Sequence, residues 1–165
     1  MNKITPSEEY NVYKRIKARE YLAHIRHLQN RIFVDMSEIA EMRENLDATG
    51  SFKMDGMPRN PNTNDDALLN AIVAIDSRCE KLQTRVNDYE KYIAECDTIL
   101  ESLTSHELAG VALNLHYLRG VTTDDIANKF HYTKSYIQTF VIGAGLVELY
   151  HKMPTTYRDK FPSAV

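Results

Sequence analysis

Apolar residues recur at alternating steps of four and three along two long stretches of the chain. In the second stretch, eleven consecutive positions between Asp65 and Leu103 match this spacing. They are Leu68, Ile72, Ile75, Cys79, Leu82, Val86, Tyr89, Ile93, Cys96, Leu100 and Leu103. A run of this length without Gly or Pro is typical of a coiled-coil helix. We therefore predict one continuous helix over residues 65–103, with both cysteines packed in its apolar seam.

The first long stretch, residues 7–47, also contains neither Gly nor Pro. Its seam is interrupted by Gln29 and Arg43, and Leu28 and Phe33 widen it on one side. The apolar seam positions are Ala18, Leu22, Ile25, Ile32, Met36, Ile39 and Leu46. This spacing predicts a second long helix that is buried along one face.

An irregular segment, residues 49–64, separates the two predicted helices and contains two Gly and two Pro. An Asp-Gly pair in its middle is a turn signal, and Thr63 or Asn64 is suited to cap the following helix. Because Met54 and Met57 flank that turn, the loop is either an exposed contact or hinge element or a plain connector. The two helices can fold back as an antiparallel hairpin, and the second can equally pair with a second copy of the chain.

After Thr104 the pattern changes to short helices, and we expect no strand anywhere in the chain. Thr122 and Thr123 offer a hydroxyl cap for one short helix, and Asp124 and Asp125 follow at the positive end of its dipole. The inward positions of this helix are Ile126, Ala127 and Phe130.

A tight turn then separates this short helix from the next one. His131 occupies the turn and must adopt a left-handed conformation, which His tolerates better than most residues. Tyr132 is expected to return into the core, and Thr133 to cap a new helix. The inward face of that helix consists of Ile137, either Phe140 or Val141, and Ala144. The spacing is that of a helix-turn-helix, with a plain helical corner as the alternative.

The bulk composition is that of a soluble folded protein, with 43% apolar and 26% charged residues. The net charge of −3 means that any nucleic-acid binding depends on a local basic surface. Two cysteines are too few for a disulfide scaffold or a cysteine zinc site. No apolar run approaches about 18 residues, and the start of the chain lacks the pattern of a secretory signal, so we expect a cytoplasmic protein.

The segment from Leu113 to Leu149 resembles the region-4 helix-turn-helix of sigma-70-type factors. The shared features are a Leu-x-x-x-Tyr helix that ends in Tyr117, a turn at Gly120, the word DDIANKF and a capped second helix. Over residues 10–150, the order of helix, loop word MDGMPRNPN, coiled-coil helix and helix-turn-helix resembles the ArpU-family phage regulators, which are related to RinA-like late activators.

This resemblance implies an activator of late packaging and lysis genes in phages and prophages of Gram-positive bacteria. It implies promoter DNA and host RNA polymerase as partners, and the bacterial cytoplasm, at the nucleoid, as the location. Together with the periodicity it predicts an all-α fold, with a coiled-coil helical hairpin at residues 7–103, a helix-turn-helix domain at 104–151 and a tail at 152–165. A homodimer or higher homo-oligomer is expected to form through the coiled coil.

Carried over onto this chain, the resemblance implies that the second helix of the motif enters the major groove of DNA. The side chains facing the groove are Thr133, Lys134, Ser135, Tyr136, Gln138 and Thr139. Gln138 would read adenine, and Lys134 would meet guanine or phosphate. Arg119, Lys129 and His131 would lie near the DNA backbone.

The groove-facing side of this helix is poor in positive charge, because Lys134 is its only charged residue, and Gly143 and Gly145 weaken the helix beyond it. Binding therefore requires dimeric presentation or basic residues elsewhere. Residues 14–31 contain six basic side chains against one acid, Glu20. They are Lys14, Arg15, Lys17, Arg19, Arg26 and Arg31. This group is either a DNA-backbone patch or a solvated helix face.

The sequence contains no Gly-rich phosphate loop, no Gly-x-Ser-x-Gly turn and no His-Glu-x-x-His word. His24 and His27 have a spacing that suits a metal, but no nearby Cys or Asp completes a site, so we expect surface histidines. Charged residues along the second long helix, including Arg85, are typical of a solvated coiled-coil exterior. We therefore expect a non-enzyme without a cofactor or metal.

Three functions fit these observations. The first is a sequence-specific DNA-binding transcription regulator, acting as an activator of late genes. The second is a small-terminase-like packaging protein, a class that also combines a helix-turn-helix with coiled-coil oligomerisation. The third is a protein-interaction module with a degenerate helix-turn-helix, for example an inhibitor of host polymerase. The low positive charge of the second helix of the motif favours this function.

Overall fold

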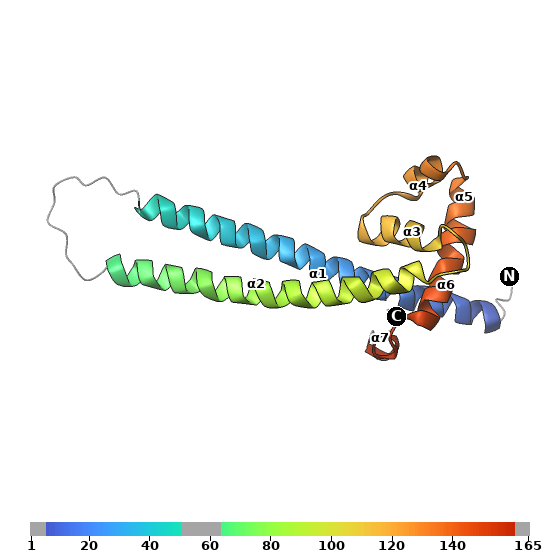
Figure 1. Cartoon of the computed structure of the whole chain (residues 1–165), viewed down its shortest axis with the longest axis horizontal. Coiled ribbons are helices and arrows are strands. Elements are labelled where there is room, and N and C mark those ends of the chain that lie inside the picture. Colours follow the sequence, from blue (N-terminus) through green and yellow to red (C-terminus); the bar gives the residue numbers. More distant parts are fainter. Residues whose placement is uncertain (1–5, 51–63, 161–165) are drawn as a thin grey trace. The chain divides into compact units, whose positions relative to one another are not determined.

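The computed structural model describes residues 6–50 and 64–160, and every regular element within these ranges is a helix (Figure 1). The prediction of an all-α chain is thereby confirmed. The two long helices are α1 (Pro6–Gly50) and α2 (Asn64–Glu101). The short elements are α3 (Ala109–Leu113), the π-helix η1 (Asn114–Leu118), α4 (Thr123–Phe130), α5 (Lys134–Tyr136), the π-helix η2 (Ile137–Ile142), α6 (Gly143–Lys152) and α7 (Thr155–Lys160).

Both predicted long helices are present, and their ends lie within about three residues of the predicted ends. The central part of the predicted loop, with Met54 and Met57, lies outside the described residues, and so does the proposed cap Thr63.

The chain divides into two compact units, and both long helices contribute to each of them. The hairpin unit consists of Leu28–Glu90, and the C-terminal unit consists of Met1–His27 together with Lys91–Val165. In the hairpin unit, α1 and α2 lie side by side in antiparallel directions (Figure 1). Among the described residues of this unit, the buried apolar ones are Ile39 and Ile75.

A buried carboxylate lies in the middle of the hairpin unit. Asp35 on α1 is buried and forms an ion pair with Arg85 on α2. A second pair joins Glu38 and Arg78, with 2.7 Å between Oε2 and Nη2. Arg85 was expected on the solvated exterior of the coiled coil, and this expectation is wrong, because its guanidinium neutralises the buried Asp35 carboxylate.

The buried seam of α1 differs from the predicted seam by one residue at every second position. Met36 was predicted to be buried, but its side chain is 56% exposed, and the neighbouring Asp35 faces α2 instead. In the same way the half-buried Leu28 and Met42 take the places of Gln29 and Arg43, which are exposed. The 4-3 spacing is therefore right in period and wrong in phase at these positions.

The seam of α2 is buried only over part of its length. Ile75, Cys96 and Leu100 are buried as predicted, whereas Leu68 and Ile72 are 45% and 40% exposed. Leu69 and Val73 are also exposed, so the first turns of α2 carry apolar side chains on several sides. One partner helix can cover only a narrow stripe, and the remaining apolar surface of this segment stays open.

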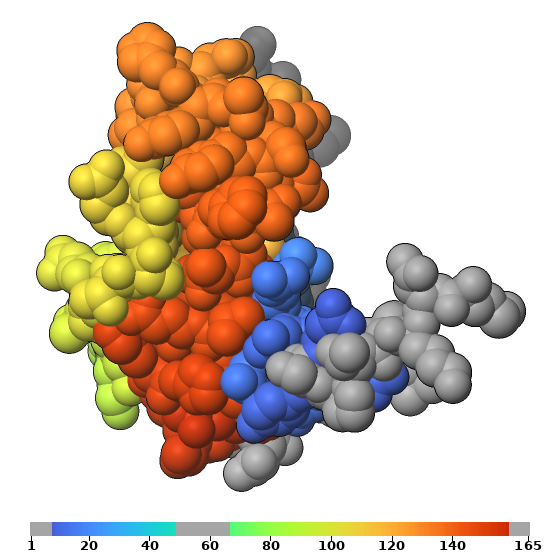
Figure 2. Space-filling view, turned by 90° about the vertical axis from the view of Figure 1, so that its right-hand side faces the viewer, coloured from blue at the N-terminus to red at the C-terminus, as the bar shows by residue number. Residues whose placement is uncertain are grey.

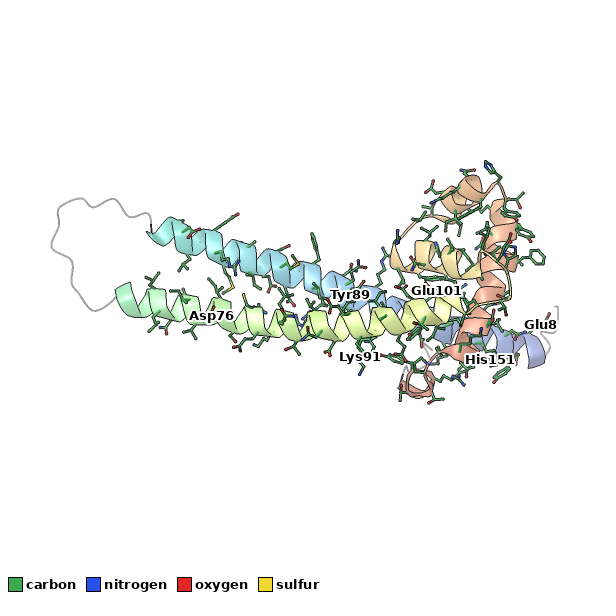
Figure 3. The ribbon with its side chains drawn as sticks, viewed as in Figure 1. Glu8, Asp76, Tyr89, Lys91, Glu101 and His151 are labelled. Carbon is green, nitrogen blue, oxygen red and sulfur yellow. The ribbon has the colours of Figure 1, made fainter. Side chains whose placement is uncertain are left out.

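In the C-terminal unit, α3 packs closely against α6. A Cβ atom on Gly145 would lie 3.2 Å from both the Ala109 and Leu113 side chains, so the close approach leaves little room for a side chain at this position. Gly145 therefore has a packing role in α6. Figure 3 marks Glu101 at the end of α2 and His151 in α6. Leu113, Leu146 and Leu149 are fully buried.

An aromatic cluster anchors α7, which lies in the segment predicted as a tail. The Tyr157 ring centroid lies 5.1 Å from that of Tyr21 and 6.0 Å from that of Tyr92. His24 is half-buried against this cluster, so its predicted surface position is wrong, whereas His27 is exposed. Burial also raises the pKa of the neighbouring Cys96 thiol to about 12, which keeps the thiol protonated and unreactive.

Candidate nucleic-acid interface

The start of α4 is fixed by the predicted cap. The Thr122 hydroxyl oxygen accepts a hydrogen bond from the backbone N–H of Asp125 at 3.2 Å. The same hydroxyl donates to the Asp125 carboxylate at 2.6 Å. The cap and the two aspartates at the positive end of the dipole confirm the predicted helix start.

The turn after α4 also has the predicted conformation. His131 is left-handed, with φ 59° and ψ 37°, and the backbone N–H of Tyr132 donates to the Ala127 carbonyl at 2.9 Å. Thr133 then caps the following helix, because its hydroxyl accepts from the Tyr136 N–H at 3.3 Å. Two short helical segments are thus joined by a turn of three residues, which is the geometry of a helix-turn-helix.

A π-helix decides which side chains of the second helix face the core. Ile137 and Val141 are fully buried and Ile142 nearly so, whereas Phe140 is 61% exposed. The spacing in the sequence allowed either Phe140 or Val141 at the core-facing position after Ile137. Because a π turn contains more residues than an α turn, the core-facing position after Ile137 falls on Val141, and Phe140 turns outward.

Residues 133–142, which we call the reading segment, present most of the predicted groove-facing side chains to solvent. Ser135, Gln138 and Thr139 are exposed, and Tyr136 is half-buried. The structure therefore brings the predicted polar residues together on one short helical surface.

The single cation of the reading segment is already paired. The Lys134 ammonium lies 2.7 Å from a carboxylate oxygen of Asp124 at the start of α4, and both side chains are more than half exposed. The pair is weak, because water screens it. It nevertheless means that the reading segment adds little net positive charge of its own.

Positive charge beside the reading segment comes from α1. A hollow of about 330 Å³ is lined by Arg19, His116, Tyr117, Thr123, Gln138 and Ile142. Arg26 lies next to the left-handed Gly120 (φ 72°), where a Cβ atom would be 2.9 Å from Nη2 of Arg26. Figure 2 shows the surface of the helix-turn-helix, in orange, next to the N-terminal part of α1, in blue.

The other basic residues predicted as a patch are divided among different environments. Lys17 is 2% exposed and paired with Glu20 at 3.1 Å, and Lys14 is buried with its ammonium 4.3 Å from the Tyr10 ring centroid. Neither lysine is therefore available to a DNA backbone, because the helix face that carries them packs inward. The Arg15 side chain donates to the Gly143 carbonyl at 3.1 Å. Arg31 belongs to the hairpin unit.

Arg119 and Lys129 line a different cavity. Its volume is about 520 Å³, and Asp97, Glu101 and Glu107 also line it. The Arg119 Nε donates to Asn114 at 3.2 Å. The acidic residues offset both cations locally, so this pair contributes little to an anion-binding surface.

An aromatic row that begins at Tyr132 and continues along the reading segment was not predicted. Tyr132 was expected in the core, but it is 38% exposed and stacks on Tyr136, with 4.9 Å between centroids and 13° between ring planes. Tyr136 in turn lies 5.4 Å from Phe140. The His106 imidazole contacts both tyrosines, and its Nε2 lies 3.3 Å from the Tyr136 hydroxyl. The spacing of four residues was visible in the sequence, but the exposure of Phe140 depends on the π turn.

A second unpredicted feature is a carboxylate that holds the connection between α2 and α3. Glu148 accepts hydrogen bonds from the backbone N–H of Thr104 at 3.0 Å and of Ser105 at 2.7 Å. Partial burial raises its pKa, but the bonds from Lys152, Thr104 and Ser105 outweigh this effect and lower the pKa to about 2. The ionised Glu148 carboxylate thus stabilises the contact between α6 and the segment that connects α2 to α3.

Within residues 6–50 and 64–160 no cluster of three His, Cys, Asp or Glu side chains has the arrangement of a metal site. No helix in the described part of the chain combines the length and apolar character needed to cross a membrane. Searches against protein-family models, curated proteins and solved structures found no significant match to this chain.

Proposed function

We propose that this chain is a sequence-specific DNA-binding transcription regulator that reads DNA with residues 133–142. The observation that carries the proposal is the capped, left-handed turn at His131, after which the polar side chains of the helix are exposed and the apolar ones buried. A helix held in this way can enter the major groove, which is about 12 Å wide, and offer Gln138 to a base edge.

Arg19 and Arg26 supply the charge that the reading segment lacks. Both side chains are exposed on α1, and Arg19 shares a hollow with Gln138 and Thr123. A phosphate next to the groove can be neutralised there while the reading segment contacts the bases. Non-specific affinity therefore depends on α1, and sequence choice depends on the reading segment.

The regulatory role rests on the resemblance to ArpU-family and RinA-like regulators. On that basis the chain activates late packaging and lysis genes of a phage or prophage, at promoter DNA and together with host RNA polymerase. It acts in the bacterial cytoplasm, at the nucleoid, as a binding protein and not as an enzyme. One copy of the reading segment carries a single cation, Lys134, so a homodimer or higher homo-oligomer formed through the coiled coil supplies the affinity.

The proposal is tested by selecting DNA from a random pool with the full chain and titrating the selected site against salt. Replacing Gln138 with Ala should reduce discrimination at one base pair by about 1–3 kcal/mol. Gln29→Ala, an exposed glutamine of α1, is the matched control and should change nothing. Enrichment of no sequence would overturn the proposal.

A protein-interaction module is the second candidate function. Two observations favour it: the pairing of Lys134 with Asp124, and the exposure of an apolar ring at Phe140. An inhibitor or partner of RNA polymerase would use this surface without reading DNA. Direct binding to purified bacterial RNA polymerase, with no enrichment of DNA, would favour this candidate.

A packaging protein of the small-terminase type is the remaining candidate. Such proteins assemble into rings of many subunits, so the molar mass of the assembly in solution separates this candidate from a dimeric regulator. Sedimentation equilibrium on the full chain measures that mass directly.

A further inference from the structure

The aromatic row consists of Tyr132, in the turn before the reading segment, and of Tyr136 and Phe140 within it; Tyr132 and Phe140 are exposed and Tyr136 is half-buried. Phe140, at the end of the row, is the most exposed of the three, since 61% of its side chain is exposed although one side contacts Tyr136. A phenylalanine that turns outward costs hydrophobic free energy unless something apolar covers it. The row therefore offers apolar surface that a ligand of suitable shape could cover.

The geometry of the row restricts how it can meet a ligand. The faces of Tyr132 and Tyr136 are stacked on each other, and the Tyr136 hydroxyl lies next to His106. A nucleobase cannot enter between these two rings without breaking that stack. The exposed parts of Tyr132 and Phe140 can still make side-on contacts with small apolar groups.

We propose that the aromatic row contacts the C5-methyl groups of thymines in the major groove. This inference rests on the proposed DNA-binding function and names the bases that the reading segment prefers. Among the base edges of the major groove, the thymine methyl is the apolar group, and aromatic side chains contact it. The exposed Ser135, Gln138 and Thr139 lie on the same short segment, so methyl contacts and hydrogen bonds can be made by one docked helix.

The test removes single thymine methyl groups from the DNA and the Phe140 ring from the protein. A site selected by the full chain is synthesised with deoxyuridine in place of each thymidine, and affinity is measured for wild type and for Phe140→Ala. Loss of a contacted methyl should weaken wild-type binding roughly fourfold. The same change should have little effect on Phe140→Ala, because its methyl contact is already absent.

Two variants control for folding and for apolar surface in general. Phe140→Leu keeps an apolar side chain and should keep part of the sensitivity to the methyl. Phe33→Ala removes a phenylalanine that is 71% exposed in the hairpin unit and should respond to deoxyuridine as wild type does. Circular dichroism of each variant checks that the helices are intact.

The outcomes separate this inference from the function on which it rests. If wild type selects a site but deoxyuridine affects wild type and Phe140→Ala equally, or affects neither, the row does not read methyl groups. The same conclusion holds if Phe140→Ala loses binding to RNA polymerase and keeps its full response to deoxyuridine. If wild type selects no site at all, the DNA-binding function itself fails.

Discussion

Lys134 and Asp124 show how one ion pair can set the charge of an exposed helical surface. Their side chains lie 2.7 Å apart, so the only cation of the reading segment is offset by an aspartate of α4. Asp124→Asn should release Lys134 for a phosphate and remove a repulsive charge. We expect roughly threefold tighter DNA binding at low salt, since surface charge interactions are worth under about 1 kcal/mol.

The same variant should increase the magnitude of the salt slope by about one, since one more cation meets the DNA. Titration of a selected site at several salt concentrations measures both effects. Asp76→Asn, which removes an exposed aspartate of α2 in the hairpin unit, is the control and should leave the slope unchanged. An unchanged slope for Asp124→Asn would place Lys134 outside the interface.

At the scale of single elements, Glu148 links α6 to the segment that precedes α3. Its pKa is lowered to about 2 in the folded chain, so its contribution is fully present above the unfolded pKa of about 4.3 and is lost as the pH falls toward 2. Glu148→Gln should therefore destabilise the chain at pH 7 by about 1–3 kcal/mol, the range for hydrogen bonds to a charged group.

Urea unfolding at pH 7 and at pH 3 measures this difference between wild type and Glu148→Gln. The gap in unfolding free energy should shrink at pH 3, because the wild-type carboxylate then begins to lose its advantage. Glu44→Gln, at an exposed site on α1, should show no gap at either pH. A gap of the same size at both pH values would assign the effect to packing and not to charge.

In the hairpin unit, the buried carboxylate whose interactions stabilise the fold is Asp35, which pairs with Arg85. Removing one partner leaves the other charge without its counterion, so Asp35→Ala should lower the free energy of unfolding by about 3 kcal/mol. Replacing both residues with Leu should recover most of that loss, since an apolar pair of similar volume avoids the desolvation of charge. Thermal unfolding of the single and double variants measures both, and a double variant as unstable as Asp35→Ala would contradict this account.

These elements also explain which parts of the fold were predictable. The helices, the caps at Thr122 and Thr133 and the left-handed His131 follow from local rules, and each was predicted from its neighbours in sequence. The burial of Asp35 in place of Met36 depends on Arg85, which is 50 residues away, so local spacing could not reveal it. The outward position of Phe140 depends on a π turn, for which the sequence holds no simple signal.

At the scale of the whole molecule, the account requires more than one copy of the reading segment. The exposed apolar side chains at the start of α2 offer a surface for a second copy, and Leu69 and Val73 are 59% and 57% exposed. Leu69→Glu with Val73→Glu should therefore lower the mass measured by sedimentation equilibrium to that of one chain without lowering the helix content. A mass that is unchanged by this double substitution would remove the start of α2 from the interface between copies.

The central claim, that the exposed face of the reading segment reads DNA, is tested most directly by selection with a variant of that face. Ser135, Gln138 and Thr139 are exposed, so replacing all three with Ala should preserve the fold. We predict that the wild-type chain enriches one sequence from a random DNA pool, and that the triple variant enriches none while it keeps weak, salt-sensitive binding. Enrichment of the same sequence by both proteins, with equal affinity, would contradict the claim.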